Sequence, residues 1–298
     1  MLKSHPLIHR FPGGRQVITS GLPRRRWHDL YHLLMTMSWP RLFASYAGFF
    51  ALFNLLFAAA YQLQPGDIAN LNPPGYWGRF FFSVETLATV GYGDMHPQTV
   101  YAHLIASAEI FTGLMSVALI TGMMFARFSR PTARILFARH AVIRQFDGRP
   151  TLMLRAANAR QNVIMEASAQ LRLIRDERSV EGTPMRRIYD LPLRRSEQPM
   201  FIFGWSLMHV IDDASPLASV TAESLKAARG YLLLTIAGTD ETTGQMLMSR
   251  QEYWSSSIHW NHTFVDIFMT GEDGIDRFDY TKFHDVLPVE PPETPEAV

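Results

Sequence analysis

Residues 83–94 of this chain read Ser-Val-Glu-Thr-Leu-Ala-Thr-Val-Gly-Tyr-Gly-Asp. Gly91 and Gly93 alternate with larger residues, and glycine is the residue that most readily adopts a left-handed backbone. Such a backbone can turn successive carbonyl oxygens inward, where four chains together would surround a dehydrated cation with rings of oxygens. Thr89 can add a hydroxyl ring at the inner end, and Tyr92 can hold the diameter of the loop from outside. The stretch therefore predicts a cation-coordinating loop.

The specificity of this motif depends on its length and its flanks. The tripeptide Gly-Tyr-Gly alone fits an ordinary glycine-rich turn, whereas the string from residue 86 to residue 93 lies between two long apolar segments. Thr-Val-Gly-Tyr-Gly is the string with which potassium channels replace the hydration shell of K⁺ by backbone carbonyls. The predicted K⁺-binding filter comprises Thr89, Val90, Gly91, Tyr92 and Gly93.

Composition excludes several classes of protein. The 298 residues are enough for about two domains, and the formal net charge is +1. No cysteine is present, which excludes a disulfide framework and thiol-based metal sites. The mean hydropathy of −0.02 is ordinary for a soluble protein, but the apolar residues are concentrated in the first half of the chain. Residues 1–26 are polar and basic, so no cleavable signal peptide is expected.

Two segments are long and apolar enough to cross a bilayer. Residues 41–63 carry no charge after Arg41, and a helix of this length spans roughly 35 Å, against about 30 Å of hydrocarbon. Residues 100–128 form the second segment, which is interrupted by Glu109. We predict an outer helix over the first segment and an inner helix over the second.

A third apolar piece, residues 76–88, lies between the two spans. As a helix it would reach about 20 Å, which is less than one crossing. A half-helix that enters and returns is tolerated only where its irregular end is buried in protein or lines water, and the filter is that end. Its carboxyl-terminal dipole would aim partial negative charge at a waiting cation. Residues 40–130, with pore helix and filter over 76–94, are therefore predicted to be one quarter of a pore in a homotetramer.

Positive charge predicts the orientation of the spans. Residues 1–41 hold seven Lys or Arg, residues 64–99 hold one, and residues 127–144 hold five. Because cytoplasmic flanks are enriched in positive charge, both termini are expected in the cytoplasm.

Residues 27–39 are too short and too polar to span a bilayer. Leucines and a methionine recur there at helical spacing, tryptophans stand at both ends, and three arginines precede the segment. This pattern is typical of a helix lying along the membrane interface. The alternative is an amphipathic helix on a soluble core, and the span that follows favours the interface. Residues 1–39 are therefore predicted to be a cytoplasmic amino-terminal segment with an interfacial slide helix.

Two carboxyl groups flank the filter. Glu85 lies on the predicted pore helix, and Asp94 directly follows the last filter residue. Two carboxyls close together in a buried site do not both ionise cheaply, so a shared proton would brace the filter. In the alternative interpretation Glu85 caps local backbone donors and Asp94 is solvated at the pore mouth. Thr86 is predicted to support the filter with them.

On the predicted inner helix, Val117, Thr121 and Phe125 recur every four residues and follow one face. If that face lines the pore, four Phe125 rings near the cytoplasmic end would close it by dewetting. Glu109 lies off that face by about 80° at 100° per residue, so we expect it to hydrogen-bond between helices.

Two glycines also lie on this helix. Gly113 and Gly122 would permit either bending or close helix packing, and packing is the more frequent role in membranes.

From residue 131 onward the pattern changes to period two, which predicts strands. Residues 131–287 are expected to form a cytoplasmic antiparallel β-sandwich. Besides residues 167–173, the candidate strands are 151–157, 186–195, 200–212, 231–238, 245–254 and 258–269, the last leading through a hairpin turn at 272–274 to 277–280. Residues 288–298 are proline-rich and acidic, and we expect a disordered tail.

These features together resemble the prokaryotic inward-rectifier potassium channels, the KirBac family. The resemblance covers nearly everything from about residue 26 to residue 289. Beyond the filter it rests on residues 162–167 (Asn-Val-Ile-Met-Glu-Ala), 199–203 (Pro-Met-Phe-Ile-Phe), 211–217 (Ile-Asp-Asp-Ala-Ser-Pro-Leu) and 279–284 (Asp-Tyr-Thr-Lys-Phe-His). It implies an α+β membrane protein with an immunoglobulin-like sandwich, in the inner membrane of a bacterium, whose four copies extend the pore into the cytoplasm.

The resemblance also implies roles for single residues. Val117 occupies a position that is acidic in strongly rectifying members, so tight block by Mg²⁺ or polyamines within the membrane does not carry over, although both remain candidate blockers. Glu166 and Glu241 match acidic positions of the cytoplasmic pore, and a solvated surface carboxylate is the alternative for Glu241. Eukaryotic relatives carry an arginine where this chain has Met95, and that arginine pairs with the glutamate of the pore helix. Met95 cannot do so, which favours the pairing of Glu85 with Asp94.

Arginines crowd the expected cytoplasmic face of the membrane. Such a cluster can hold anionic lipid headgroups at about 1 kcal/mol each. The alternative is that basic flanks merely fix the topology, as in any membrane protein. The candidate lipid-binding residues are Arg24, Arg25, Arg26, Arg127, Arg130, Arg134 and Arg139.

Two alternatives explain less of the sequence. Outside the channel class, a membrane-anchored β-sandwich scaffold with a non-conducting pore leaves the filter string unexplained. Within the channel class, a weakly selective cation pore is disfavoured by Tyr92. An enzyme is not expected. His259 and His262 suggest a metal pair, but in a strand their spacing puts them on opposite faces. No cofactor and no nucleic-acid partner are expected.

Overall fold

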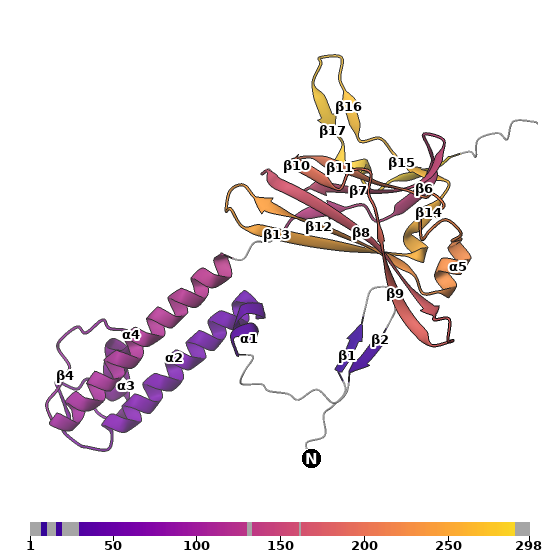
Figure 1. Cartoon of the computed structure of the whole chain (residues 1–298). Coiled ribbons are helices and arrows are strands. Elements are labelled where there is room, and N and C mark those ends of the chain that lie inside the picture. Colours follow the sequence, from indigo (N-terminus) through magenta and orange to yellow (C-terminus); the bar gives the residue numbers. More distant parts are fainter. Residues whose placement is uncertain (1–6, 11–15, 20–29, 130–132, 161, 290–298) are drawn as a thin grey trace, which may run out of the picture. The chain divides into compact units, whose positions relative to one another are not determined.

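The structure is a computed structural model that describes residues 7–10, 16–19, 30–129, 133–160 and 162–289 (Figure 1). The chain forms two compact units with a boundary between residues 130 and 131, and residues 8–18 belong to the second unit. We call the unit that contains residues 19–130 the helical unit and the unit that contains residues 131–298 the β domain. The short strands β1 (Leu7–Arg10) and β2 (Gln16–Thr19) pair with each other.

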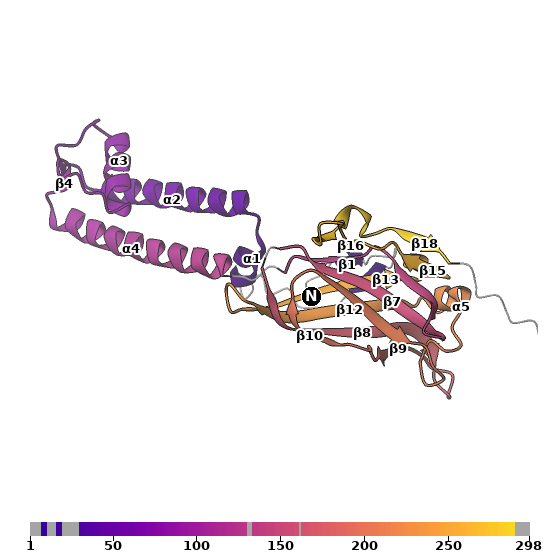
Figure 2. The same ribbon diagram turned by 90° about the horizontal axis from the view of Figure 1, so that it is seen from above.

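Helices dominate the helical unit, where α2 and α4 lie side by side and α3 packs against them (Figures 1 and 2). The two-residue strands β3, before α3, and β4, after residues 89–93, pair with each other and join the two loops. The elements are α1 (Leu30–Thr36), α2 (Trp39–Tyr61), β3 (Ile68–Ala69), α3 (Tyr76–Leu87), β4 (His96–Pro97) and α4 (Val100–Phe128).

Both long helices are suited to hydrocarbon. α2 and α4 are each long and apolar enough to cross a membrane, and only 17% of their most apolar windows is buried inside the chain. Large apolar side chains such as Phe43, Leu52 and Leu119 are exposed on them. α2 begins at Trp39, with Pro40 in its first turn, and ends at Tyr61, two residues earlier at each end than the predicted outer helix.

Small residues on α4 allow α3 to approach closely. Ala102, Ala106 and Gly113 are buried there, as is usual where helices pack without a hydrophobic driving force. A Cβ added to Gly113 would lie 2.2 Å from the carbonyl oxygen of Leu87, the last residue of α3. A Cβ added to Gly122 would meet no atom within 4 Å. Gly113 is therefore a packing glycine within the chain, and Gly122 is not.

Arg127 ties the end of α4 to the connection between α1 and α2. Its guanidinium donates to the carbonyl oxygens of Leu34 (2.7 Å) and Met37 (2.6 Å). It also lies 4.5 Å from the ring centroid of Trp39, a favourable cation–π distance. Residues 30–39 of the predicted slide helix are described: α1 ends at Thr36, and Trp39 already begins α2. Leu30 and Leu33 are exposed on α1.

The β domain is a sandwich of two five-stranded sheets. In the first, the strands run in the order β10 (Glu197–Phe201), β8 (Ile164–Arg178), β12 (Tyr231–Asp240) and β13 (Met246–Trp254), with β9 (Pro184–Leu191) also paired to β8. In the second, the order is β11 (Gly204–Val210), β7 (Arg149–Asn158), β6 (Ala141–Phe146) and β14 (Ile258–Trp260), with β5 (Ile135–Phe137) paired to β7.

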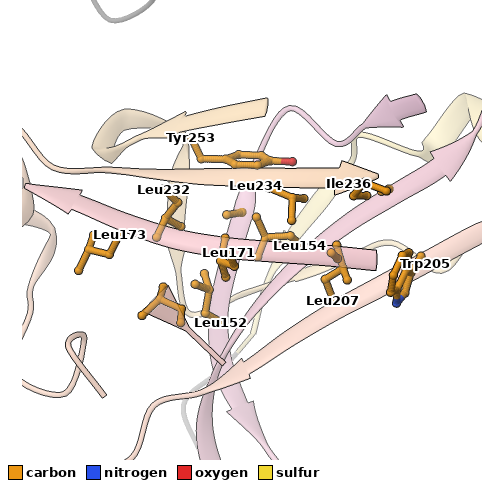
Figure 3. Packing of buried hydrophobic residues seen from close by; sticks show 14 of the residues in the cluster. Leu152, Leu154, Leu171, Leu173, Trp205, Leu207, Leu232, Leu234, Ile236 and Tyr253 are labelled. Carbon is orange, nitrogen blue, oxygen red and sulfur yellow. The ribbon is translucent and has the colours of Figure 1, made fainter. Parts of the chain in front are cut away.

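An apolar core lies between these sheets. Side chains along β12 are buried at every second position, which is the alternation expected of a strand with one face inward. Leu154 from the second sheet and Leu171 and Leu234 from the first lie together in this core (Figure 3). Leu154 and Leu234 are fully buried. The apolar positions of the period-two pattern therefore face inward and form the core of the sandwich.

A bulge interrupts β8 at Glu166. The register moves from Ala237 opposite Ser168 to Thr239 opposite Met165, so β8 has one extra residue at this point. Glu166 takes a left-handed φ of 49°. Bulges of this kind re-aim a side chain, and that of Glu166 is exposed.

Several predicted strands are broken in the structure. Residues 200–212 form two strands, β10 and β11, on different sheets, because the chain turns after Phe201. The segment 258–269 is likewise divided, since Asn261 has a φ of 55°, and β14 pairs parallel to β6 rather than antiparallel. After β14, this segment continues as β15 (His262–Phe264) and β16 (Phe268–Thr270). These pair with the later strands β18 (Val286–Pro288) and β17 (Asp276–Phe278), respectively. α5 (Ala222–Ala227), β5 and β6 had no clear signal in the sequence.

Truncating Leu171 to alanine is expected to destabilise the β domain by about 2–5 kcal/mol, because it leaves a cavity in the core. Leu171 is 2% exposed, whereas Leu287 is 53% exposed and supplies the matched control Leu287→Ala. Denaturant unfolding followed by tryptophan fluorescence, to which the buried Trp205 contributes, measures the difference. Equal effects of the two substitutions would contradict the placement of this core.

Gly113→Ala is expected to lower the melting temperature of the full-length protein in detergent, because the added methyl group collides with the backbone of α3. Gly122→Ala is the control, and it should be neutral or gain up to about 1 kcal/mol from helix propensity. Size-exclusion chromatography after heating measures both. A greater loss from Gly122→Ala would show that the packing role has been assigned to the wrong glycine.

Candidate functional site

The handedness of the backbone alternates along residues 89–93. Thr89, Gly91 and Gly93 have φ values of 56°, 54° and 86°, while Val90 and Tyr92 between them do not have positive φ. In an extended strand successive carbonyls point to opposite sides, and reversing the handedness at every second residue turns them to the same side. Thr89 adopts this conformation at a cost of about 1–2 kcal/mol, since it is not a glycine. Such strain is typical of functional sites.

The amides of this segment are satisfied from behind. Both Val90 N and Gly91 N donate to the carbonyl oxygen of Glu85, at 2.8 and 3.2 Å, and Thr89 N donates to that of Thr86 at 3.0 Å. Among the residues that the structure describes, no donor reaches the carbonyl oxygens of residues 89–92. The end of α3 thus binds the amide groups of the segment and leaves the carbonyl oxygens of the segment available to a cation.

The predicted hydrogen bond between Glu85 and Asp94 is not formed within the described chain. Asn70, which has a φ of 55°, donates its side-chain amide to the main-chain oxygen of Asp94 at 3.1 Å. Glu85 instead supports the filter through its main-chain oxygen. The hydroxyl of Thr86 donates to Phe82 O at 2.8 Å on its own helix, so Thr86 also acts on the filter through its main chain. Met95 packs against the apolar cluster around Tyr61.

A buried ion pair fixes the first half of α3, and sequence analysis missed it. Arg79 Nη2 lies 3.2 Å from Asp67 Oδ1, and their side chains are 9% and 0% exposed. The guanidinium also donates to the carbonyl oxygens of Tyr61 and Gly75, at 3.3 Å each. A lone arginine inside the apolar residues 76–88 was the available signal, because buried charges are found paired.

A polar network fixes the second half of α3. Asn54 of α2, Ser83 of α3 and Glu109 of α4 are each 0% exposed, as is Tyr61 at the end of α2. Tyr61 donates its hydroxyl to Glu109 Oε2 at 2.8 Å. The hydroxyl of Ser83 contacts both Glu109 Oε1 and Asn54 Oδ1, the latter at 3.0 Å. The prediction that Glu109 hydrogen-bonds between helices is confirmed.

The predicted pore-lining residues of α4 are exposed in the single chain. Val117 is 56% and Phe125 is 74% exposed, and Thr121 is exposed between them. Phe125 lies in the last turn of α4, where its carbonyl accepts from Ser129 N at 2.9 Å. The described part of the chain therefore does not cover these side chains.

The two predicted acidic residues of the β domain lie at the same end of neighbouring strands. Glu166 is exposed at the bulge of β8, and Glu241 is exposed at the turn that follows β12. Glu241 N donates to Val163 O at 3.1 Å, which joins this turn to the start of β8. Glu241 also lines an open cavity of about 770 Å³ together with Asn162 and Tyr280.

The candidate lipid-binding arginines differ in their engagement. The guanidinium of Arg127 is used by Leu34 and Met37, as described above. Arg134 and Arg139 are exposed. The remaining candidates, Arg24, Arg25, Arg26 and Arg130, lie outside the described residues.

The prediction that His259 and His262 lie on opposite faces of a strand is wrong. Asn261 breaks the strand between them, and their ring centroids are 5.2 Å apart. His259 Nε2 also lies 3.0 Å from His140 Nδ1. The pKa of His259 is lowered, mainly by burial and to a smaller extent by the neighbouring imidazoles of His140 and His262. Across the described ranges, no three His, Cys, Asp or Glu side chains are arranged to hold a metal ion.

Comparison with known proteins gives concordant results for both units. Residues 135–297 match the family described as the inward rectifier potassium channel C-terminal domain, and residues 48–130 match the family described as ion channel. The chain is 40% identical over 282 residues to the inward rectifier potassium channel Kirbac3.1 of Paramagnetospirillum magnetotacticum, covering 94% of this chain and 96% of the relative.

Animal proteins are similar at a greater distance. The human G protein-activated inward rectifier potassium channel 3 is 29% identical over 289 residues, covering 89% of this chain and 72% of the relative. The guinea-pig (Cavia porcellus) ATP-sensitive inward rectifier potassium channel 11 is 29% identical over 287 residues, covering 89% and 73%. Together with the filter and the two membrane-capable helices, these matches show that the chain is a membrane protein of the inward rectifier potassium channel family.

Proposed function

We propose that this chain forms a homotetrameric channel that conducts K⁺ selectively across a membrane. The observation that carries the proposal is the row of carbonyl oxygens at residues 89–92, which accept no hydrogen bond from another described residue. One chain offers a bound ion oxygens from one side only. Four copies about a common axis surround the ion with complete rings, which is what replacing its hydration shell requires.

The channel lies in the inner membrane of a bacterium with both termini in the cytoplasm. Support comes from the charge asymmetry, with twelve Lys or Arg in residues 1–41 and 127–144 (seven and five) and one in residues 64–99. In this orientation the β domain lies in the cytoplasm.

The gate lies at the cytoplasmic end of α4. Four exposed Phe125 rings on neighbouring copies would form an apolar constriction, and such a constriction stops ions by excluding water. Val117, at the position that is acidic in strongly rectifying relatives, gives the membrane part of the pore no carboxylate. Block by Mg²⁺ or polyamines therefore depends on Glu166 and Glu241 and is weak.

Anionic lipids modulate the channel through its basic cytoplasmic face. Arg134 and Arg139 are exposed, and a basic residue near an anionic membrane surface contributes about 1 kcal/mol to binding. Arg127 contributes differently, because its donors already bind the main chain at the end of α1. A lipid that moved α1 along the membrane would thus act on α4 through this residue.

Rubidium uptake into liposomes containing the purified protein is expected to be saturable, blocked by Ba²⁺ and unaffected by excess Na⁺, because the filter carbonyls fit a larger dehydrated ion. Chemical crosslinking of the same sample is expected to yield tetramers. Equal uptake of Na⁺ would indicate a weakly selective cation pore. A monomer without flux would favour a scaffold protein that recruits partners through its β domain.

Phe125→Ala is expected to raise basal rubidium flux several-fold, because a smaller apolar side chain leaves room for water at the constriction. Phe111→Ala removes a similarly exposed ring (66% against 74%) elsewhere on α4 and should leave the flux near that of the parent. Unchanged flux in Phe125→Ala would place the gate at another residue.

A further inference from the structure

The polar network between α2, α3 and α4 contains more hydrogen-bonding contacts than its hydroxyl groups can supply. Three contacts lie in series: Tyr61 Oη to Glu109 Oε2, Glu109 Oε1 to Ser83 Oγ, and Ser83 Oγ to Asn54 Oδ1. Each contact needs one proton. Tyrosine and serine hydroxyls carry one each, and neither an ionised carboxylate nor an amide oxygen carries any. Two protons therefore have to serve three contacts.

Turning over the amide of Asn54 does not supply the missing proton. Asn54 Nδ2 donates to the carbonyl oxygen of Phe50 at 2.7 Å, so its amide nitrogen is fixed on that side. If the amide were reversed, two oxygens would face each other at this distance inside the membrane, which is strongly unfavourable. Asn54 Oδ1 therefore faces Ser83, and Ser83 has to donate to it.

Once Ser83 donates to Asn54, its oxygen meets Glu109 Oε1 as an acceptor. Two acceptors in contact in a buried site repel each other unless one of them carries a proton. Only Glu109 can take up that proton, because Ser83 is already a neutral hydroxyl. The contact between Glu109 and Ser83 is then a hydrogen bond donated by the carboxylic acid.

The surroundings of Glu109 favour the same state. Its side chain is 0% exposed, and within the described residues no Lys or Arg lies within ion-pair distance of it. Arg79, the nearest candidate on α3, is paired with Asp67. An ionised carboxylate in the hydrocarbon region without a cation is costly, whereas a neutral acid with both oxygens hydrogen-bonded is tolerated.

We propose that Glu109 is a neutral carboxylic acid whose proton completes an unbroken hydrogen-bond chain from Tyr61 through Ser83 to Asn54. It is a positioning residue: Ser83 lies two residues before Glu85, whose carbonyl oxygen holds the filter amides. This series of hydrogen bonds thus fixes the position of α3 relative to α2 and α4. This positioning role rests on the proposed conduction of K⁺, whereas the protonation state of Glu109 does not.

Infrared spectroscopy of the full-length protein in lipid vesicles at neutral pH tests the protonation state. We expect a carbonyl stretch of a protonated carboxylic acid that is lost in Glu109→Gln and kept in Glu223→Gln, which alters an exposed carboxyl on α5. Absence of this band in the parent protein, or its persistence in Glu109→Gln, would overturn the proposal whether or not the protein conducts.

Ion selectivity tests the positioning role. Glu109→Gln keeps one donor and one acceptor in place and should retain the ratio of rubidium to sodium uptake. Glu109→Met, of similar size but without a donor, should lower that ratio about fivefold or more, the effect of leaving a buried polar partner unpaired. If that variant does not assemble, Ser83→Ala provides the same comparison. Equal ratios in the glutamine and donor-free variants would contradict the role, and loss of flux in the parent itself would contradict the proposed function instead.

Discussion

Carbonyl oxygens without a partner in their own chain are the constraint on which this structure depends. An unsatisfied backbone carbonyl in a bilayer costs several kcal/mol, so membrane segments normally satisfy every one of them internally. Residues 89–92 do the reverse, since their amides bind the end of α3 while their oxygens stay free among the described contacts. In the proposed tetramer, cations and further copies of the chain would complete the segment, which would tie its folding to its function.

The rest of the helical unit fixes the helix that carries this segment. Arg79, Ser83 and Leu87 are spaced by four residues and lie on the buried face of α3. Each is held by a different interaction: an ion pair with Asp67, a polar network with Glu109, and backbone contact at Gly113. One contact per turn leaves α3 little freedom to slide, and the proposed discrimination between ions of similar size requires that rigidity.

Sequence predicted what is local or compositional and missed what depends on distant partners. The filter is a contiguous string whose glycines dictate the backbone, and the spans follow from length and hydropathy. The partner of Arg79 lies twelve residues away across a loop, and Asn70 approaches Asp94 only through the β3–β4 pairing, so no periodicity revealed either contact. In the β domain, the left-handed backbone of Asn261 breaks the predicted strand, so His259 and His262 do not lie on opposite faces.

The most direct test of the account is to locate ions in crystals of the full-length protein grown in rubidium. Anomalous scattering should place a row of rubidium ions on a fourfold axis, each surrounded by rings of carbonyl oxygens that residues 89–92 contribute from four copies. Crystals in which the four filters share no axis, or in which rubidium binds elsewhere and not between these oxygens, would contradict it.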